Sequence, residues 1–406
     1  MRPTLVLLHR WFGLLSAVFL FIAGLTGALI AWDHELDGLL NPSFHEARHP
    51  DRPALAPLEL ASRFEQSDPR LRVRYVPLSI EPGEALSLFV EPRVDPATKQ
   101  PYELGFDEVV LDPATGDVQG KRKWGVPSLA RENVMSFLYR LHYSLHLGNP
   151  MSLLPFGMLL MGIVAIAWAI DAFVAIVLSF PSRKTWRRSF KVRTDQGGYR
   201  FNFDLHRAGG VWAWPLLLVL AVTAVGLNLD DQVMRPLVSL FSPLAEQPTH
   251  RIVENAGEPE LGREEAVARA LEEATTRGIV APPGGVFYAS FAAAYGVGFH
   301  EPGKGHGDGG LGNPWLYVDA RTGELLGATV PGEGSAGDVF MQAQFPLHSG
   351  RIAGLPGRIL VSLLGLLVAT LSVTGVVIWA RKRVAKERTV RARAAAEPSL
   401  AGATDA

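Results

Sequence analysis

The chain of 406 residues contains no cysteine. Disulfide bonds, iron–sulfur clusters and thiolate metal sites are therefore excluded. Covalently attached c-type haem is excluded as well, because its attachment needs the motif C-x-x-C-H. A metal ion bound by this protein must be held by histidine, methionine or carboxylate side chains.

An excess of charge of either sign is also missing. The sequence has 39 Lys and Arg residues against 40 Asp and Glu residues, so the formal net charge is -1. This balance gives no argument for nucleic acid, which we do not expect as a partner. The even total hides a local asymmetry, because the basic residues gather in a few segments.

Apolar residues, in contrast, are abundant and unevenly placed. They make up 48% of the chain and concentrate in four runs, residues 11–32, 152–180, 210–229 and 359–379. Each run has about the 20 residues that a membrane-spanning helix needs, so we predict four spans in contact with membrane lipid. The first run is too long for the apolar region of a signal peptide and lacks an A-x-A-like site, so we expect a retained anchor.

Basic residues predict the orientation of these spans. The loop at 183–207 carries eight Lys and Arg residues, and the segment after the last span begins with RKRVAKER. Under the positive-inside rule, this loop and both termini lie on the cytoplasmic side of a bacterial inner membrane. The predicted order is span 1–32, external segment 33–140, span 141–182, cytoplasmic loop 183–207, span 208–230, external segment 231–346, span 347–382 and a disordered cytoplasmic tail 383–406.

Similar motifs recur along the chain. LHRWFGL and LHRAGGV place His9 opposite His206, and SLHLG and PLHSG place His146 opposite His348. VLDPATGDVQG in the first external segment matches YVDARTGELLG in the second, and the three offsets are 197, 202 and 207 residues. The pattern predicts a duplication with parallel halves and small insertions in the loops.

The two long segments between the spans have patterns typical of compact α+β domains. In each, a stretch with helical spacing (55–66 and 262–278) precedes strand-like runs and a hairpin with a Thr-Gly turn. The predicted fold class is therefore a membrane protein with four transmembrane α-helices and two external α+β domains in duplicated halves.

The motifs LHRWFGL, YRLHYSLHLG, FPLHSGRIAGLPGR and GVVIW resemble those of the PepSY-associated transmembrane helix family, over residues 3–383. Cysteine-free members with four spans are similar to inner-membrane ferric-siderophore reductases of the ferrioxamine-reductase type. The resemblance implies two external PepSY-like domains and a haem-dependent oxidoreductase. Its partner would be a periplasmic Fe(III)-siderophore, which it would reduce to release Fe(II). No G-x-G-x-x-G follows a strand, so the electron donor stays open, with quinol as one candidate.

The repeated histidines are the candidate cofactor ligands. Imidazole suits iron, and haem b binds through axial nitrogen ligands without covalent attachment. With the resemblance, they predict two haem b groups per chain, an inner haem between His9 and His206 and an outer haem between His146 and His348. His142 lies one helical turn from His146 and is either the alternative ligand or a proton or iron contact above the outer haem. The competing interpretation is that these histidines bond lipid headgroups at the membrane surface.

Other charged residues extend the candidate site. Arginine forms bidentate pairs with carboxylates, so arginines near the histidines are candidate partners of haem propionates. These are Arg351 and Arg358 for the outer haem and Arg10 and Arg207 for the inner haem. Lipid phosphate and membrane topology are the alternatives for these arginines. Asp171 lies in the middle of the second span, where a carboxylate is costly. We expect it to serve proton or quinol chemistry, or to bond a neighbouring helix.

Two other functions compete with siderophore reduction. PepSY modules resemble domains associated with peptidase inhibition, so the external segments could belong to an envelope sensor or an inhibitor without redox activity. A general haem b electron carrier that serves another periplasmic reductase is the third hypothesis. A haem spectrum separates the second hypothesis from the other two.

Overall fold

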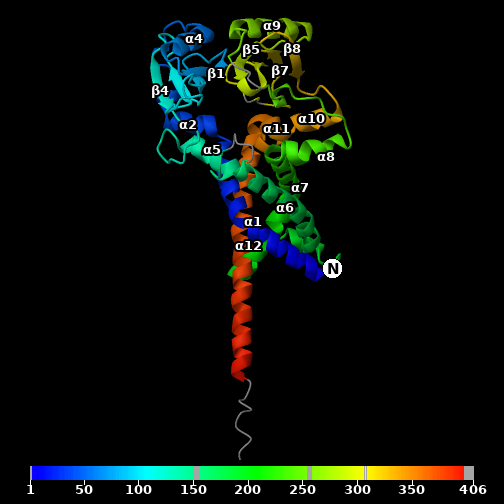
Figure 1. Cartoon of the computed structure of the whole chain (residues 1–406). Coiled ribbons are helices and arrows are strands. Elements are labelled where there is room, and N and C mark those ends of the chain that lie inside the picture. Colours follow the sequence, from blue (N-terminus) through cyan, green and yellow to red (C-terminus); the bar gives the residue numbers. More distant parts are fainter. Residues whose placement is uncertain (1, 150–154, 254–257, 306, 308, 397–406) are drawn as a thin grey trace, which may run out of the picture.

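The computed structural model describes residues 2–149, 155–253, 258–305, 307 and 309–396. Within these residues, four helices are long and apolar enough to cross a membrane. They form a bundle below a β-sheet (Figure 1). They are α1 (Arg2–Ile30), α6 (Phe156–Ser179), α7 (Gly198–Asn228) and α12 (Gly354–Ala396). The four predicted spans therefore correspond to four long helices, although α7 begins inside the segment 183–207 that was predicted to be a loop.

The bundle has a square arrangement. α1 packs against α6 and α12, and α7 packs against the same two helices, so α1 and α7 lie on one diagonal. The contact between α1 and α12 depends on glycine. A Cβ atom on Gly24 would lie 2.5 Å from the carbonyl oxygen of Gly365, so a larger residue would push the two backbones apart.

Above the bundle, the described strands form a single eight-stranded antiparallel sheet in the order β4-β3-β2-β1-β5-β6-β7-β8. The strands are β1 (Leu71–Pro77), β2 (Leu86–Pro92), β3 (Glu108–Leu111), β4 (Val118–Arg122), β5 (Pro283–Ala289), β6 (Ala294–Phe299), β7 (Trp315–Asp319) and β8 (Leu325–Thr329). Residues 33–140 supply β1 to β4, and residues 231–346 supply β5 to β8. β1 pairs with β5 through Tyr75 and Phe287, so the two predicted domains share one sheet. This pairing removes one exposed edge from each half.

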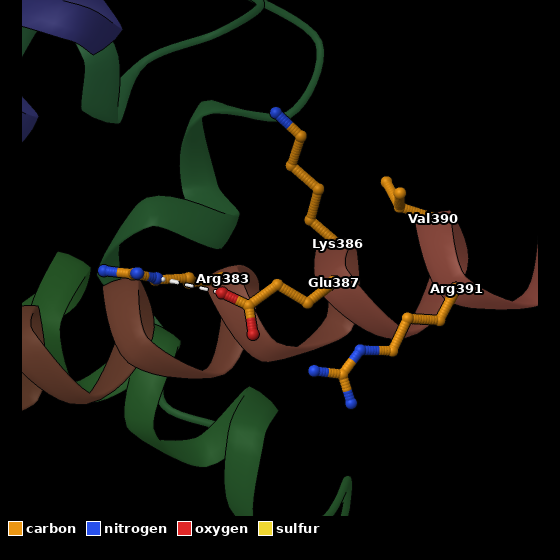
Figure 2. Close-up of a pocket in the computed structure, with 5 residues that line it drawn as sticks. All are labelled: Arg383, Lys386, Glu387, Val390 and Arg391. Atoms are coloured by element: carbon orange, nitrogen blue, oxygen red, sulfur yellow. Dashed lines mark hydrogen bonds and ion pairs between the residues drawn. The ribbon is translucent and has the colours of Figure 1, made fainter. Parts of the chain in front are cut away.

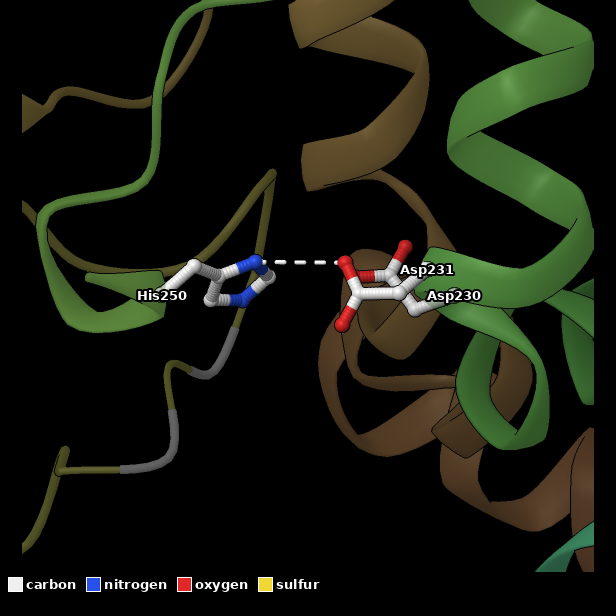
Figure 3. Close-up of side chains that lie close together, drawn as sticks. All are labelled: Asp230, Asp231 and His250. Atoms are coloured by element: carbon white, nitrogen blue, oxygen red, sulfur yellow. Dashed lines mark ion pairs between the residues drawn. The ribbon is translucent and has the colours of Figure 1, made fainter. Parts of the chain in front are cut away.

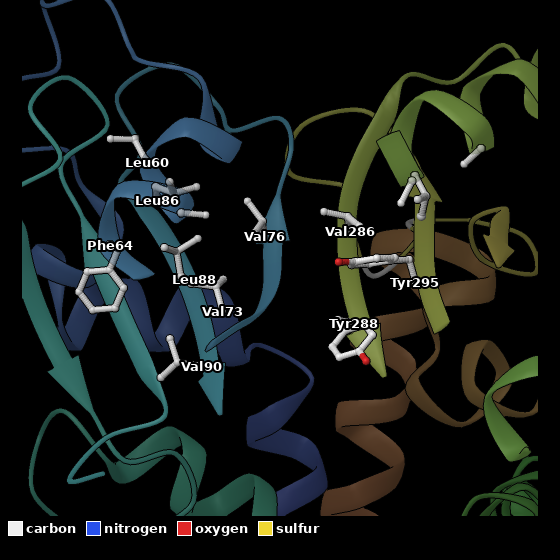
Figure 4. Packing of buried hydrophobic residues seen from close by; sticks show 14 of the residues in the cluster. Leu60, Phe64, Val73, Val76, Leu86, Leu88, Val90, Val286, Tyr288 and Tyr295 are labelled. Carbon is white, nitrogen blue, oxygen red and sulfur yellow. The ribbon is translucent and has the colours of Figure 1, made fainter. Parts of the chain in front are cut away.

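One face of the sheet carries the main hydrophobic core. α4 (Pro57–Ser67) and α9 (Arg263–Thr276) both cover this face (Figure 1). Leu88, Val286 and Tyr295 belong to one continuous cluster of buried side chains that spans both halves (Figure 4). An ion pair of 2.7 Å between Arg263 and Glu65 adds a contact across the junction.

The two Thr-Gly hairpins have the same local structure. Asp112 accepts hydrogen bonds from the backbone N–H groups of Ala114 and Thr115. Asp319 accepts the corresponding bonds in the second hairpin, from Arg321 and Thr322. Both aspartates are buried and close the turn that reverses the chain.

Two short helices lie between the sheet and the bundle (Figure 1). α5 (Val134–Ser144) packs against α1, and α11 (Gln344–Ser349) packs against α7. The predicted second span, 141–182, is therefore not one helix, because the chain turns after α5 and resumes as α6. The predicted fourth span, 347–382, is interrupted in the same way between α11 and α12.

The remaining helical segments are α2 (Asp33–Leu40), α3 (Pro42–His45), α8 (Arg235–Ser239), α10 (Ala336–Gln342), the π turn η2 (Asp230–Met234), and the 3-10 turns η1 (Trp186–Phe190), η3 (Pro248–His250), η4 (Ser290–Ala292) and η5 (Arg351–Ala353).

The predicted disordered tail is a helix over residues 383–396. α12 continues without a break to Ala396, and residues 397–406 lie outside the described part of the chain. The segment contains no glycine or proline and is rich in alanine, arginine and lysine, which favour helix. Arg383 and Glu387 form an ion pair of 3.0 Å at the i,i+4 spacing that supports an exposed helix (Figure 2).

Candidate functional site: two histidine pairs

The first histidine pair lies within the helix bundle, far from the sheet. His9 on α1 and His206 on α7 have ring centroids 6.1 Å apart. Because α1 and α7 are diagonal partners, the two imidazoles face each other across the bundle. We call them the tail-side pair, since they lie toward the end from which α12 projects. The structure thus brings together the two residues that the first repeated motif aligned.

Each ring of the tail-side pair forms hydrogen bonds with a helix of the other diagonal, α6 or α12. His9 donates from Nδ1 to the carboxylate of Asp171 on α6, at 2.9 and 3.0 Å. His206 Nδ1 bonds the carbonyl oxygen of Leu371 and the hydroxyl of Thr374 on α12, at 3.1 and 3.0 Å. Carboxylate and carbonyl oxygens accept only, so these partners assign the proton to Nδ1. The lone pair then lies on Nε2, which is the arrangement that metal-binding histidines use.

The second pair lies where the bundle meets the sheet. His142 on α5 and His348 on α11 have ring centroids 6.1 Å apart, the same separation as in the tail-side pair. We call them the sheet-side pair. His142 Nδ1 bonds the carbonyl oxygen of Ala23 and the hydroxyl of Thr26 on α1, at 3.0 and 3.1 Å. His348 Nδ1 bonds the hydroxyl of Thr223 on α7 at 2.9 Å.

Both threonine hydroxyls accept from histidine because their own protons are used elsewhere. Thr26 Oγ1 donates to the carbonyl oxygen of Ile22, and Thr223 Oγ1 donates to that of Val219. The sheet-side rings therefore also carry the proton on Nδ1 and the lone pair on Nε2.

The alignment of SLHLG with PLHSG predicted that His146 would face His348. In the structure, His142 faces His348 instead. The backbone at Leu145 and His146 is left-handed, with φ of 54° and 56°, which ends α5 and turns the His146 ring away. That ring stacks on Phe137 at 4.6 Å, and its Nε2 bonds the Phe137 carbonyl oxygen at 2.9 Å.

Sequence reasoning missed the threonines that hold the sheet-side pair. Thr26 and Thr223 are 197 residues apart, the same offset that relates His9 to His206. That common offset was the signal that could have identified them. In both α1 and α7 the histidine and the threonine are 17 residues apart, which places the two levels about 26 Å apart along a helix.

The separation within each pair fits two imidazoles on opposite sides of one metal ion. A histidine nitrogen binds a metal at about 2 Å, so two such nitrogens are about 4 Å apart and the ring centres about 6 Å apart. Both observed separations are 6.1 Å. Each pair could therefore supply two nitrogen ligands to one iron ion.

The tail-side pair also has open space beside it. Gly13 and Gly210 follow His9 and His206 by one helical turn, and a Cβ atom built on either glycine would meet no atom within 4 Å. A flat group held between the two rings can therefore approach both helix backbones. The residues present fit a haem bound without covalent attachment.

The arginines expected to meet propionates have partners within the chain. Near the sheet, Arg358 donates to both carboxylate oxygens of Glu35 at 2.7 Å and lies over the ring of Trp32. Burial raises the pKa of Glu35, but the bond from Arg358 and a backbone bond outweigh it and hold that pKa below its usual value. Arg351 lies 3.7 Å from Asp33. These pairs join η5 and the start of α12 to α2, the helix that follows α1.

The two arginines near the tail-side pair also have neighbours of their own. Arg207 donates to Asp204 at 3.1 Å and to the carbonyl oxygen of Arg188 at 2.7 Å. Arg10 lies over the ring of Trp11 at 5.6 Å. The propionate role of all four arginines stays a prediction.

A separate group of side chains follows the end of α7. Asp230, Asp231 and His250 have ligand-type atoms within 4.8 Å of one another (Figure 3). His250 Nδ1 lies 3.2 Å from Asp231, which joins η3 to η2. Burial and the neighbouring Asp231 carboxylate raise the pKa of Asp230. The ion pair accounts for the placement of His250 without a metal ion.

Four long apolar helices define a membrane protein, in which two histidine pairs lie at two levels. Its sequence matches the family model of the PepSY-associated TM region over residues 6–382, and the chain belongs to that family. No curated protein matches the chain.

Proposed function

We propose that this protein is a haem b electron-transfer protein of the bacterial inner membrane that reduces Fe(III)-siderophore complexes outside that membrane. The observation that carries the proposal is the repeated histidine pair. Two pairs have the same ring separation of 6.1 Å, and all four rings use Nδ1 for hydrogen bonds and leave Nε2 for iron. When bound, haem b supplies reversible one-electron chemistry.

The orientation follows from the distribution of charge. The basic loop 183–207 and the basic end of α12 belong on the cytoplasmic side. The tail-side pair then holds the inner haem, and the sheet-side pair holds the outer haem. Both termini are cytoplasmic, and the sheet lies in the periplasm beside the outer haem.

The chain's own residues position the proposed ligands. Hydrogen bonds fix the tautomer of the four rings, and their acceptors are Asp171, Thr374, Thr26 and Thr223. Groups that bond the other nitrogen of a metal-binding histidine have this effect. The common offset of 197 residues for His9 with His206 and Thr26 with Thr223, together with the matching hairpins, supports a duplicated origin of the two halves.

The proposed substrate follows from the family resemblance and from the chemistry of iron. Siderophores hold Fe(III) through hard oxygen ligands, and Fe(II) binds such ligands more weakly, so the addition of one electron releases the metal. Electron delivery and positioning suffice for this reaction, and no residue acts as a nucleophile. Quinol is the proposed donor class.

The test uses full-length protein purified in detergent from cells supplied with haem. A dithionite-reduced minus air-oxidised spectrum should show b-type bands from two haem groups per chain. The reduced protein is then mixed without oxygen with a ferric hydroxamate siderophore, and with its gallium complex as a matched control that accepts no electron. We expect the ferric complex alone to reoxidise the haem, with Fe(II) trapped by a chelator.

Each other outcome points to a different function. A red protein that the ferric complex does not reoxidise is a general electron carrier for another reductase. A featureless spectrum contradicts electron transfer and leaves an envelope sensor or peptidase inhibitor.

A further inference from the structure

The four histidines differ in the charge of the group that holds them. His206, His142 and His348 bond carbonyl or hydroxyl oxygens, which are neutral. His9 alone among these four bonds a carboxylate, that of Asp171, through both of its oxygens. The two pairs therefore have the same ring separation but differ by one negative charge.

The position of Asp171 makes this charge costly. The residue is 9% exposed and lies in α6, whose sequence FGMLLMGIVAIAWAIDAFVAIVLS contains no other charged side chain. Among the described residues, the ion pair of Asp171 is with His9. A carboxylate buried among apolar helices is retained only where a positive partner offsets the loss of water. A ligand bound to an iron cation is such a partner.

His206, the histidine that matches His9 in the repeat, shows that a carboxylate is not needed to orient the ring. Thr374 on α12 bonds His206 Nδ1, the atom that corresponds to His9 Nδ1, and it does so with a hydroxyl. Orientation of the imidazole can therefore be achieved without charge. The carboxylate at Asp171 supplies something that the hydroxyl does not.

A carboxylate bonded to a histidine ligand makes that ligand more basic and stabilises the more highly charged state of the metal. For a haem, this means that Fe(III) is favoured over Fe(II), so the reduction potential falls. We propose that Asp171 is a positioning residue that lowers the reduction potential of the inner haem below that of the outer haem. This inference rests on the proposed function, because it requires that both histidine pairs hold haem.

The consequence is a direction for electron transfer. With both haem groups bound, one electron would pass from Fe(II) of the inner haem, which is oxidised, to Fe(III) of the outer haem, which is reduced, and no bond would form or break. With the carboxylate on the inner side, this transfer is downhill from the cytoplasmic side to the sheet. On this proposal, the charge of Asp171 favours transfer in that direction.

The test is a redox titration of the haem absorbance in full-length, haem-loaded protein. Asp171→Asn keeps the size of the side chain and an oxygen that accepts from His9, and it removes the charge. We expect the lower-potential step to rise by at least a tenfold change in its equilibrium constant, which is about 59 mV for one electron, while the upper step stays in place. The same substitution in a His142→Ala chain, which retains only the inner haem, assigns the step that moves.

Two further variants keep the test decisive. Asp171→Glu retains the charge and should leave the lower step closer to its wild-type position than Asp171→Asn does. Thr374→Asp adds a second carboxylate, on the His206 side, and should lower the same step further. If Asp171→Asn no longer holds the inner haem, the outcome for Thr374→Asp decides, and an unmoved step overturns the proposal.

Failure of this inference and failure of the proposed function give different results. Wild-type protein without haem contradicts the proposed function. Wild-type protein with two haem groups, whose potentials do not respond to Asp171→Asn, contradicts the role of Asp171 alone.

Discussion

The tail-side and sheet-side pairs have the same ring separation, but different elements of the fold carry and support their histidines. The tail-side histidines lie on the long helices α1 and α7 and are held by α6 and α12. The sheet-side histidines lie on the short helices α5 and α11 and are held by threonines of α1 and α7. α1 and α7 thus supply the ligand at one level and its support at the other. The two levels share helices but no ligand, so each should be removable without loss of the other.

The largest expected effect is the loss of one whole cofactor. His9→Ala or His206→Ala removes one of the two proposed nitrogen ligands at the tail-side level, and we expect the haem content to fall from two to one per chain. The measurement is the haem-to-protein ratio with the reduced spectrum of the remaining haem. A chain that keeps both groups, or loses both, would contradict the independence of the two levels.

Filling the open space beside the tail-side pair should have the next largest effect. Gly13→Leu places a side chain where a Cβ atom now meets nothing within 4 Å, so we expect most of the inner haem to be lost while the outer haem stays. Leu15→Phe on the same helix is the control, because Leu15 is 68% exposed and its added bulk points outward. Equal haem loss in both variants would show that the space is not a cofactor site.

Removal of a threonine hydroxyl at the sheet-side level should have a smaller effect. Thr223→Val removes the 2.9 Å bond between the Thr223 hydroxyl and His348 Nδ1 and leaves the backbone carbonyl of Leu220 as the remaining acceptor. Loss of a group that orients a metal-binding histidine weakens metal binding by about 10- to 100-fold, and we expect the lower end of that range here. Titration of haem into haem-free protein measures the affinity. Thr370→Val is the control, since the Thr370 hydroxyl bonds only the carbonyl oxygen of Leu366 among the described residues. An unchanged affinity in Thr223→Val would argue against His348 as a ligand.

The smallest effect on haem is expected from the sheet, where stability alone should change. Asp112→Ala removes a buried acceptor of the Ala114 and Thr115 N–H groups, at a cost of about 1–3 kcal/mol. We expect a lower unfolding temperature by circular dichroism and an unchanged haem content. A change in haem content would mean that the sheet and the bundle do not form independently.

The pH dependence of that contribution has a definite sign. Burial raises the pKa of Asp112, but the bonds from Ala114, His49 and Thr115 outweigh it and lower that pKa below 3.8. A carboxyl group whose pKa is lowered by folding stabilises the protein above the unfolded value, and the contribution is lost as the pH falls through the folded pKa. The difference in stability between wild type and Asp112→Ala should therefore shrink below pH 3.8.

Composition predicted the parts of the fold that lipid imposes. A bilayer requires about 20 apolar residues per span, so the four long helices could be found from the sequence. The pairing of His9 with His206 was also accessible, because both occur in the same LHR motif of their helices. The pairing of β1 with β5 was not, since the two strands are far apart in sequence and either could have been an exposed edge.

The sheet-side pair shows where sequence reasoning fails. SLHLG and PLHSG are similar, yet their histidines are not equivalent. In SLHLG, α5 ends at Ser144, and the left-handed backbone at Leu145 and His146 keeps His146 off the helix. A backbone reversal at Leu145 and His146 has no clear sequence signal, since neither is glycine. Asp171 was recognised as costly, but the sequence could not show that its partner is His9.

The most direct test of the account is a comparison of His142→Ala with His146→Ala. Both remove an imidazole from the same short segment, and the measurement is the number of b-type haem groups per chain. We predict that His142→Ala keeps one haem, whereas His146→Ala keeps two. One haem in His146→Ala together with two in His142→Ala would contradict the sheet-side pair.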